Sequence, residues 1–476
     1  MMDTKALRQK ILDLAIHGKL VPQDPNDEPA SVLLERIKAE KERLIKEGKI
    51  KRSKKSAKSS DTPHYENVPF EVPNSWVWCR LEDIAYVASG STPDKTCFVE
   101  NGVPYIKMYN LRNQKIDFAY HPQYITEEVH NGKLQRSRTE VGDLIMNIVG
   151  PPLGKLAIIP TTLPQANFNQ AAVLIRPYKF KEVLVSYLKV YLEEMSEINS
   201  IATRGSAGQV NISLTQSQNM RIPIPPLNEV RRIIEEVSKY DILIDSLKQN
   251  ITDIQNLIAY TKSKILDLAI HGKLVLQDPN DEPAIELLKR INPDFTPCDN
   301  GHYPVGWIET ILGELFSHNT GKALNSSNKE GIFKDYLTTS NVYWNKFDFT
   351  AIKQMPFKES ELNKCTVTKG DLLVCEGGDI GRSAIWNYDY DICIQNHIHR
   401  LRPKIDLCVP FYYYTFAYLK ENNLIGGKGI GLLGLSSNAL HKIEMPLPPL
   451  AEQQRIVQKI EELFSVLDNI QNALEV

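Results

Sequence analysis

The sequence predicts an α+β protein in which two related modules are separated by two long antiparallel coiled-coil helices, in a pseudo-twofold arrangement. The first observation is a repeat: 20 of the 21 residues at 10–30 recur at 264–284. The second is a looser repeat of IPIPPLNEVRRI at 222–233 as MPLPPLAEQQRI at 445–456. The third is a heptad pattern of apolar residues beside these repeats. Together they indicate a duplicated scaffold that holds two divergent modules.

The duplication is circular. Pro225 precedes Lys264 by 39 positions, and Pro448 precedes Lys10 by 38 positions when Val476 is joined to Met1. The C-terminal and N-terminal segments together therefore rebuild one copy of the central segment. We expect one continuous helix and one split helix, packed side by side, and we expect the chain ends to lie close together.

These repeats divide the chain into five segments. They are an N-terminal scaffold segment with a basic linker, module one, a central region with a long helix, module two, and a C-terminal scaffold helix, at residues 1–60, 61–222, 223–299, 300–445 and 446–476. Prolines at the end of each module mark where the next helix begins.

The two seams of the expected coiled coil are continuous through the central region. The first seam is Val230, Val237, Ile244, Ile251, Ile258 and Ile265, and the second is Ile233, Tyr240, Leu247, Ile254, Thr261 and Leu268. The C-terminal and N-terminal segments continue the pattern, with a single break at Gln453. We expect both helices to end at a His-Gly pair, His17-Gly18 and His271-Gly272, because glycine suits the left-handed position after a helix.

Composition excludes several classes of protein. With 42% hydrophobic and 24% charged residues, the chain resembles an ordinary globular protein. It shows no long apolar run and no apolar N-terminal signal region, so we expect a cytoplasmic location and no membrane contact. Seven cysteines without a CxxC pair argue against a disulfide framework or a zinc ribbon. The net charge of −2 means that any surface for nucleic acid must be local.

The run KEGKIKRSKKSAKSS at 46–60 is strongly basic and has no apolar period. It is typical of a solvated flexible linker, and an arm that contacts phosphates remains the alternative.

The two modules share a succession of features. Each opens with a tryptophan before a strand (Trp76, Trp307), and each has a Gly-Asp-led apolar strand followed by a tight turn and a basic residue, Lys155 or Arg382. An amide-bearing strand that ends in Arg-Pro comes next, then a helix and a glycine-rich loop. Several short strands with a few helices predict an α+β fold for each module.

Polar clusters recur at matching places between these elements. Arg, Lys, Asn and Gln have the forked or charged side chains that pair with base edges and phosphates in DNA. The candidates for DNA binding are Lys107, Asn110, Arg112, Asn113, Lys155, Asn169, Gln170, Arg204, Ser206 and Gln209 in module one, and Thr339, Ser340, Asn341, Lys346, Arg382, Gln395, Asn396, His397 and Lys428 in module two.

Motifs of catalysis are missing from the sequence. GPPLGKL at 150–156 lacks the spacing and the Ser or Thr of a phosphate loop, and the GGKGIGLLG run lacks the preceding strand of a dinucleotide site. Neither a nucleophile elbow, nor a His-Glu-x-x-His pair, nor an Asn-Pro-Pro-Tyr-like motif is found. We therefore expect a chain that binds and positions, with no catalytic, cofactor-binding or metal-binding residues.

The doubled motif KILDLAIHGKLVPQDPNDEPA, the Pro-Pro-Leu-x-Glu-x-x-Arg-Ile helix starts and the two modules opened by Pro-x-x-Trp resemble the specificity subunit of type I restriction-modification enzymes. The resemblance covers essentially the whole chain. It implies two target recognition domains, each reading half of a bipartite site in double-stranded DNA, with the helices as a ruler. It also implies docking of two modification subunits, which use S-adenosylmethionine, and of restriction subunits, which hydrolyse ATP with Mg.

Two features depart from the family pattern. They are Gln453 in the heptad and the linker at 46–60, which has no counterpart after the central repeat. The competing hypothesis is a structural adaptor whose modules bind proteins or carbohydrate. Such an adaptor would show no salt-dependent affinity for duplex DNA.

Overall fold

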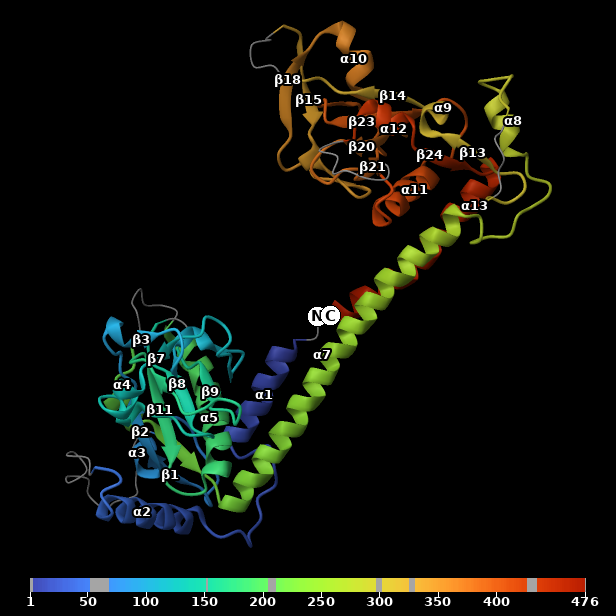
Figure 1. The fold of residues 1–476 in the computed structure, drawn as a ribbon. Helices are drawn as coiled ribbons and strands as arrows, with labels where there is room; N and C mark the ends of the chain where they lie inside the picture. Colours follow the sequence, from blue (N-terminus) through green and yellow to red (C-terminus); the bar gives the residue numbers. More distant parts are fainter. Residues whose placement is uncertain are drawn as a thin grey trace. The chain divides into compact units, whose positions relative to one another are not determined.

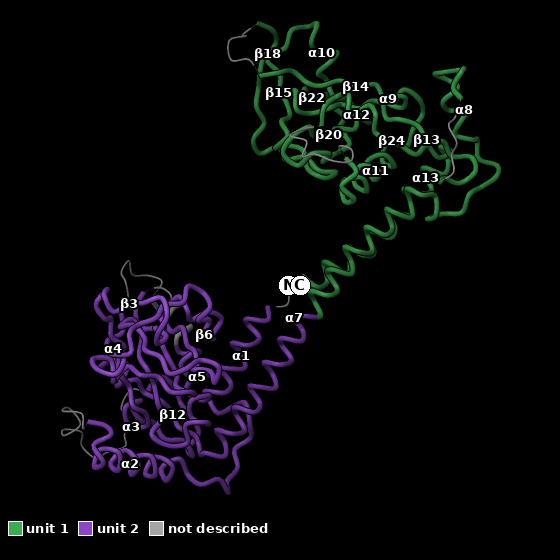
Figure 2. Tube along the Cα trace, viewed as in Figure 1, with its two compact units in different colours: residues 1–2, 250–476 green, residues 3–249 purple. Residues whose placement is uncertain are grey.

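The computed structural model describes residues 3–51, 68–150, 153–203, 211–296, 302–324, 330–425 and 435–475, with the side chains of 196–203 and 475 left aside. The chain forms two compact units (Figure 2). Unit 2, residues 3–249, contains module one, and unit 1, residues 250–476 with 1–2, contains module two. No helix in the described ranges has both the length and the apolar character needed to cross a membrane. The expected proximity of the chain ends concerns Met1 and Val476, which lie outside the described residues.

Unit 2 combines helices with short strands, as expected for an α+β module (Figure 1). Its helices are α1 (Thr4–Ile16), α2 (Ala30–Lys46), α3 (Leu81–Ile84), α4 (Glu127–Asn131), α5 (Lys181–Thr203) and α6 (Leu214–Gln218), with short 3-10 turns η2 (Lys95–Cys97), η3 (Met108–Asn110) and η4 (Gln135–Ser137). Its strands are β1 (Val77–Arg80), β2 (Ala85–Ser89), β3 (Phe98–Val99), β4 (Val103–Ile106), β5 (Leu111–Arg112), β6 (Lys115–Ile116), β7 (Tyr124–Ile125), β8 (Leu144–Asn147), β9 (Leu156–Ile158), β10 (Asn167–Phe168), β11 (Ala172–Pro177) and β12 (Arg221–Ile224).

Two four-stranded sheets form the body of module one. The order is β2-β11-β8-β9 in the first sheet, which is antiparallel, and β10-β4-β7-β3 in the second, where β10 and β4 run parallel. One face of the first sheet packs on α5, with Val173 and Ile175 buried against Leu184 and Leu188 in one apolar core. The last strand, β12, returns to pair with β1 beside the scaffold.

Unit 1 repeats this plan. Its helices are α8 (Ala284–Lys289), α9 (Leu312–Leu315), α10 (Glu359–Cys365), α11 (Val409–Glu421), α12 (Ser437–His441) and α13 (Leu450–Glu475), with the 3-10 turn η5 (Thr339–Asn341). Its strands are β13 (Ile308–Ile311), β14 (Phe316–Thr320), β15 (Ile332–Leu337), β16 (Val342–Tyr343), β17 (Lys346–Phe347), β18 (Lys353–Phe357), β19 (Thr366–Val367), β20 (Leu372–Cys375), β21 (Ser383–Ile385), β22 (Ile392–Ile394), β23 (Ile398–Pro403) and β24 (Glu444–Leu447).

The sheets of module two correspond to those of module one. The order β14-β23-β20-β21 matches β2-β11-β8-β9, and β13 pairs β24 as β1 pairs β12. In the second sheet, β15 pairs β22 in parallel, as β4 pairs β10. The prediction of two related α+β modules is thereby confirmed.

One detail of the strand prediction is wrong. The amide-bearing segment that we expected to be one strand is two strands in each module, β10 and β11 or β22 and β23, which belong to different sheets. The chain turns between them, and the main-chain N–H of Ala172 donates to the carbonyl of Asn169 at 3.3 Å. Neither turn contains a glycine or a proline, so the sequence does not reveal it.

A helix of 44 residues, α7 (Leu227–Ile270), joins the two modules in the chain. In unit 2, α1 packs against it: Arg8 Nε donates to Asp241 Oδ1 at 2.9 Å, and further on Gln23 bonds Glu229. In unit 1, Lys262 of α7 pairs with Asp468 of α13. Beyond the end of α7, Gln277 bonds Glu452 at the start of α13. In both units, positions along the continuous segment rise as those of its partner helix fall, so both helix pairs are antiparallel, as predicted.

The first seam of the heptad is buried more completely than the second. Val230, Val237, Ile244, Ile258 and Ile265 are buried, whereas in the second seam Tyr240 and Ile254 are 36% and 37% exposed. One neighbouring helix covers only one stripe of the α7 surface, and the second seam lies at the edge of that stripe.

Gln453, which breaks the heptad, is fully buried and has its hydrogen bonds satisfied. Its Nε2 donates to the carbonyl of Pro448 at 2.8 Å, and its Oε1 accepts from the main-chain N–H of Cys408 at 2.9 Å. Cys408 is the residue that precedes α11. The glutamine therefore ties the start of α13 to the start of the module-two helix, where an apolar residue would leave that N–H unpaired.

The 21-residue repeat forms the same joint in both units. In unit 2, Glu229 is buried near the start of α7 and accepts from the indole N–H of Trp76 at 3.0 Å and from Gln23 at 2.6 Å. In unit 1, Glu452 accepts from Trp307 at 2.9 Å and from Gln277 at 3.0 Å. Burial raises the pKa of Glu229, and the two donated hydrogen bonds oppose that rise.

Glycine is required at the end of the helix in each joint. Gly18 and Gly272 both have φ of +65°, and a Cβ at Gly272 would lie 2.4 Å from the Pro304 ring. The chain leaves the helix in a left-handed conformation at this glycine, and the proline and tryptophan side chains of the module lie against it. The prediction that both helices end at His-Gly is confirmed.

Candidate nucleic-acid interface

Three loops of module one meet at one end of its first sheet. The main-chain N–H of Asn169 donates to Ile106 at 3.1 Å, Ile148 donates to Ala171 at 2.8 Å, and Asn147 donates to Lys155 at 2.9 Å. These bonds join the hairpin loop at 107–116, the loop between β8 and β9, and the turn at 167–171. We call this set the loop surface of module one.

Module two holds the corresponding loops by corresponding bonds. Gln395 donates to Leu337 at 2.9 Å, Glu376 donates to His397 at 2.9 Å, and Cys375 donates to Arg382 at 2.8 Å. The loop surface of module two is therefore the hairpin loop at 338–347, the loop at 375–382 and the turn at 395–397.

In each module, a described residue that follows the glycine-rich segment bonds to this surface. The N–H of Ile212 donates to Ile148 at 2.9 Å, and the N–H of Leu435 donates to Glu376 at 3.0 Å. These residues follow the glycine-rich segments in the chain. Four predicted site residues, Arg204, Ser206, Gln209 and Lys428, lie in those segments, outside the described residues.

The remaining predicted site residues all lie on the two loop surfaces. The exposed ones are Arg112, Asn113, Gln170, Ser340, Lys346 and His397. The half-buried ones are Lys107, Lys155, Asn169, Thr339, Arg382, Gln395 and Asn396. Only Asn110 and Asn341 are buried, at 0% and 2% exposure. The structure thus brings the described candidates of each module together, although they are far apart in the sequence.

The two buried asparagines shape the hairpin loops from inside. Asn110 Oδ1 accepts from the N–H of Lys107 at 2.9 Å, and its Nδ2 donates to the carbonyls of Asp117 and Tyr120. Asn341 makes the matching bonds to Thr338 and Asp348, at 2.8 and 2.9 Å. Their amides are occupied within the protein, so we correct their predicted role from base contact to support of the loop.

Replacing Asn110 with alanine tests that correction. We expect the change to lower the free energy of unfolding of unit 2 by about 1–3 kcal/mol, because three partly buried main-chain groups lose their partner. DNA affinity will fall for all sequences alike, and the preferred sequence will not change. Chemical unfolding and selection of bound sites from random DNA measure the two effects. A new preferred base in one half-site would instead assign Asn110 to base reading.

Two arginines on these surfaces pack against tyrosine rings. In module one, the Arg112 guanidinium carbon lies 4.1 Å from the centroid of the Tyr120 ring, and Arg112 Nε lies 3.6 Å from Asp117 Oδ2. In module two, the Arg382 guanidinium carbon lies 5.0 Å from the centroid of the Tyr343 ring, and its Nη2 donates to the carbonyl of Thr339. Both guanidinium groups are therefore held in place by the protein.

The structure also identifies residues that the sequence reasoning missed. Lys115 occupies in β6 the place that Lys346 occupies in β17, because the two hairpins superpose in register. Glu376 lies 3.4 Å from His397, so a carboxylate belongs to the loop surface of module two. Aligning the hairpins on Asn110 and Asn341 would have revealed Lys115. No comparable sequence pattern points to Glu376, because the corresponding residue of module one is Ile148.

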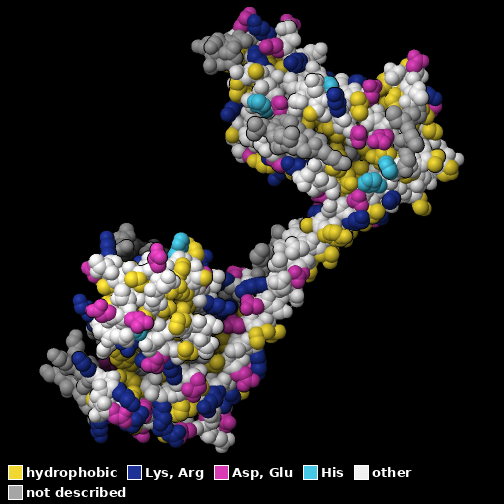
Figure 3. Space-filling view, in the orientation of Figure 1, with side chains coloured by type: hydrophobic (Ala, Val, Ile, Leu, Met, Phe, Trp, Pro, Cys, Tyr) yellow, Lys and Arg dark blue, Asp and Glu magenta, His cyan; other side chains and the backbone are white. Residues whose placement is uncertain are grey.

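Charges of both signs are mixed over the visible face of the protein. Figure 3 shows Lys and Arg side chains interspersed with Asp and Glu side chains on both units. This agrees with the net charge of −2. An interface for a polyanion must therefore be a local arrangement of loops.

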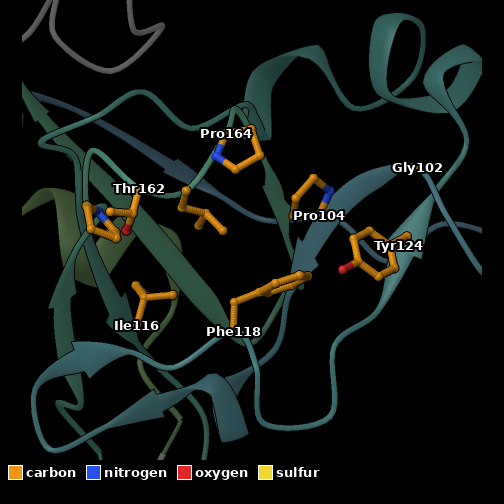
Figure 4. A pocket seen from close by; sticks show the side chains of 9 residues that line it. Gly102, Pro104, Ile116, Phe118, Tyr124, Thr162 and Pro164 are labelled. Atoms are coloured by element: carbon orange, nitrogen blue, oxygen red, sulfur yellow. The ribbon is translucent and has the colours of Figure 1, made fainter.

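A pocket of about 370 Å³ opens beside the hairpin of module one (Figure 4). Ile116 and Phe118 lie on one side of it, and Pro164 lies on the opposite side. Its lining consists of Gly102, Pro104, Ile116, Phe118, Tyr124, Pro160, Thr162, Leu163 and Pro164. Module two has larger side chains at the corresponding strand: Phe347 matches Ile116 and packs on Trp386, with 5.0 Å between ring centroids. The two modules therefore differ in shape next to their loop surfaces.

Three histidines pack together inside module two. Their ring centroids are 4.9 Å apart for His318 and His399 and 4.8 Å apart for His318 and His441. His399 Nε2 lies 2.7 Å from the carbonyl of Leu435 and must donate to it, so His399 Nδ1 accepts from His318 Nε2 at 2.8 Å. Burial, followed by the neighbouring histidines, lowers the pKa of His318 to about 4. Burial also lowers the pKa of His399.

The cysteines that the structure describes are unpaired thiols, in agreement with the sequence analysis. Within the described ranges, no group of three or more His, Cys, Asp or Glu side chains has an arrangement that could hold a metal ion.

The chain is similar to known proteins along nearly its whole length. It is 28% identical to the specificity subunit of the type I restriction enzyme EcoEI of Escherichia coli, over 99% of this chain and 91% of that protein. It is 27% identical to the EcoAI specificity subunit of Escherichia coli, over 98% of this chain and 90% of that protein.

A solved structure from work on complex assembly and conformational transition of a type I R-M system shares the fold. It has a TM-score of 0.55 and 20% identity, and the match covers 86% of this chain and 94% of that one. The profile of the type I restriction modification DNA specificity domain matches twice, at residues 73–256 and 304–476. Since these two matches span most of the sequence, the chain belongs to the family of type I restriction-modification DNA specificity proteins.

Proposed function

We propose that this chain is the DNA-recognition subunit of a type I restriction-modification complex, in which each module reads one half of a bipartite site. The observation that carries the proposal is the pair of loop surfaces. They are held by the same main-chain bonds but display different side chains, such as Lys155 in one module and Arg382 in the other. A common frame with unlike reading groups is what recognition of two different half-sites requires.

The side chains divide into two roles in this proposal. The amides and arginines, among them Gln170, Gln395 and Asn396, contact base edges, because their forks match the donors and acceptors of the major groove. The lysines, namely Lys107, Lys115, Lys155 and Lys346, contact phosphates and fix the position of the module on the duplex. The carboxylate of Glu376 would repel a phosphate, so it faces an amino group of a base.

The chemistry belongs to partner subunits in this proposal, and this chain is not itself catalytic. Two modification subunits dock on the helices and scaffold and use S-adenosylmethionine, while restriction subunits use ATP and Mg. The complex acts on cellular DNA in the cytoplasm. The alternative of an adaptor for proteins or carbohydrate has no support in the comparisons, which join this chain to DNA specificity subunits.

The helix that joins the modules sets the spacer between the half-sites. Because α7 is one continuous helix, a heptad inserted after Gln249 preserves the seam and lengthens the connection by about 10 Å. We expect the preferred spacer to grow by about 3 base pairs, at roughly 3.4 Å per pair. Selection of bound sites from a random pool, with the chain assembled with its modification subunits, measures the spacer.

The control replaces exposed residues of α7 without changing its length, and the spacer should then stay the same. If both half-sites are still selected at the original spacing after the insertion, the helix is not the ruler. If the unmodified complex selects no sequence at all, recognition of DNA by this chain is itself refuted.

A further inference from the structure

Each loop surface presents one arginine whose guanidinium plane is fixed against a tyrosine. They are Arg112 on Tyr120 and Arg382 on Tyr343, at 4.1 and 5.0 Å. The two are not equivalent in the fold. Arg112 is the second residue of strand β5, and Tyr343 itself occupies that place in β16. Arg382 precedes β21, at the place where module one has Lys155 before β9.

The surroundings of Arg382 leave its charge available. Among the described residues it forms no salt bridge, and it is held by the carbonyl of Thr339, the side chain of Cys375 and the ring of Tyr343. Its Nε is buried and has no hydrogen-bond partner there. Arg402 of the same module is different, because its charge is neutralised by Asp371 at 2.7 Å. Arg382 is therefore placed for a ligand rather than for the core.

Arg112 is presented in a comparable way. Its side chain is 47% exposed, so its 3.6 Å approach to Asp117 is a weak surface ion pair that a stronger partner can replace. The guanidinium carbon lies close to the ring of Tyr120. The adjoining turn at Asn113 and Gln114 has φ of +48° and +56°, which gives the hairpin a tight two-residue connection.

A fixed guanidinium recognises a particular base. Its two parallel N–H donors match the O6 and N7 acceptors of guanine, whereas lysine in the same place supplies only a point charge. Stacking on a ring reduces the conformational freedom that the arginine loses on binding, which strengthens the discrimination.

We propose that each module reads one guanine through its stacked arginine, Arg112 in module one and Arg382 in module two. The inference rests on the proposed function and deepens it by naming the base and the reading residue. Because the two arginines come from different loops of the same frame, the guanines occupy different positions within their half-sites. This is one physical reason why the two half-sites are unlike.

The test selects bound sites from a random DNA pool with the full chain assembled with its modification subunits. Arg382→Lys keeps the charge but removes the fork, so preference for one guanine in the second half-site should fall at least about fivefold. The first half-site should be unchanged, which also shows that the variant complex is folded. Arg112→Lys should give the converse result.

A second variant gives a positive signal. Glutamine pairs with the N6 and N7 groups of adenine, so Arg382→Gln should shift that one position from guanine towards adenine. Tyr343→Leu keeps the arginine but removes its support, and it should weaken the same guanine preference and no other. The matched control, Lys346→Ala on the neighbouring strand, should lower affinity for every sequence and leave the preference intact.

Three results separate the possibilities. Loss of one guanine preference in the half-site of the altered module supports the inference. An unchanged half-site, or an even loss across all sequences, overturns it while leaving the proposed function in place. Failure of the unaltered complex to select any bipartite site refutes the proposed function instead.

Discussion

Replacing Trp307 with alanine will lower the free energy of unfolding of unit 1 by about 4 kcal/mol. The side chain is 1% exposed and lies in the apolar core beside Phe411, with 6.3 Å between ring centroids. Its indole N–H is also a donor to the buried carboxylate of Glu452. The change therefore creates a large cavity and removes a hydrogen bond from a buried charge.

Hydrogen exchange measured peptide by peptide provides the readout, because the two units can be followed separately. Peptides of unit 1 should lose protection, and those of residues 3–249 should keep it. Trp76→Ala is the matched variant, and it should reverse the pattern, since Trp76 makes the same bond to Glu229. Equal loss in both units from either change would show that the joints are not independent.

Acid will destabilise unit 1 through the histidine cluster. The pKa of His318 falls from about 6.5 in the unfolded chain to about 4 in the folded protein. As pH falls, the unfolded state therefore binds the proton first. The stability that the neutral His318 contributes is fully present above the unfolded pKa. It is lost as pH falls from about 6.5 towards 4. At pH 5 the loss from this group is about 2 kcal/mol.

The groups that face His318 act in the same direction. The pKa of His318 is lowered by each of its four charged or titratable neighbours, His399, His441, Lys364 and Arg400. None of them would stabilise a protonated His318. Protonation of His399 Nδ1 would also break its bond from His318. Glu376 has the opposite effect on His399, because it raises the pKa of that ring. Burial of His399 outweighs this effect, so its pKa is lowered.

Module one supplies the control for this prediction. Its residues at the places of His318 and His399 are Val87 and Val173, which hold the same register positions in the corresponding strands β2 and β11. Urea unfolding at pH 7.5 and pH 5.0, followed by hydrogen exchange, should show the acid loss in unit 1. The variant with both histidines changed to valine should lose that acid sensitivity. If it remains just as sensitive, the cluster is not its source.

The repeats in the sequence predicted the scaffold well, for a physical reason. The 21-residue repeat encodes a joint in which Trp307, Glu452 and Gln277 must meet, and Gly272 must allow the chain to pass. Such a joint tolerates few substitutions, so both copies stay alike. The antiparallel helices followed from the repeats, and the α+β fold of the modules followed from the strand and helix patterns within each of them.

The candidate surface was predicted only in part. The matching clusters lie on matching loops because the loops sit between recognisable strands. Burial within a loop, however, depends on contacts that the sequence does not display, and Asn110 and Asn341 look like any other polar loop residue. Likewise, the turn between β10 and β11 contains no glycine or proline, so two strands looked like one.

Helix α7 contributes residues to two separate apolar cores. Val230 and Ile244 belong to one of them, and Ile265 and Ile270 belong to the other. If one core melts, the surviving core still anchors its own half of the helix. Thermal unfolding of either module should therefore leave the other module folded, together with its own half of α7.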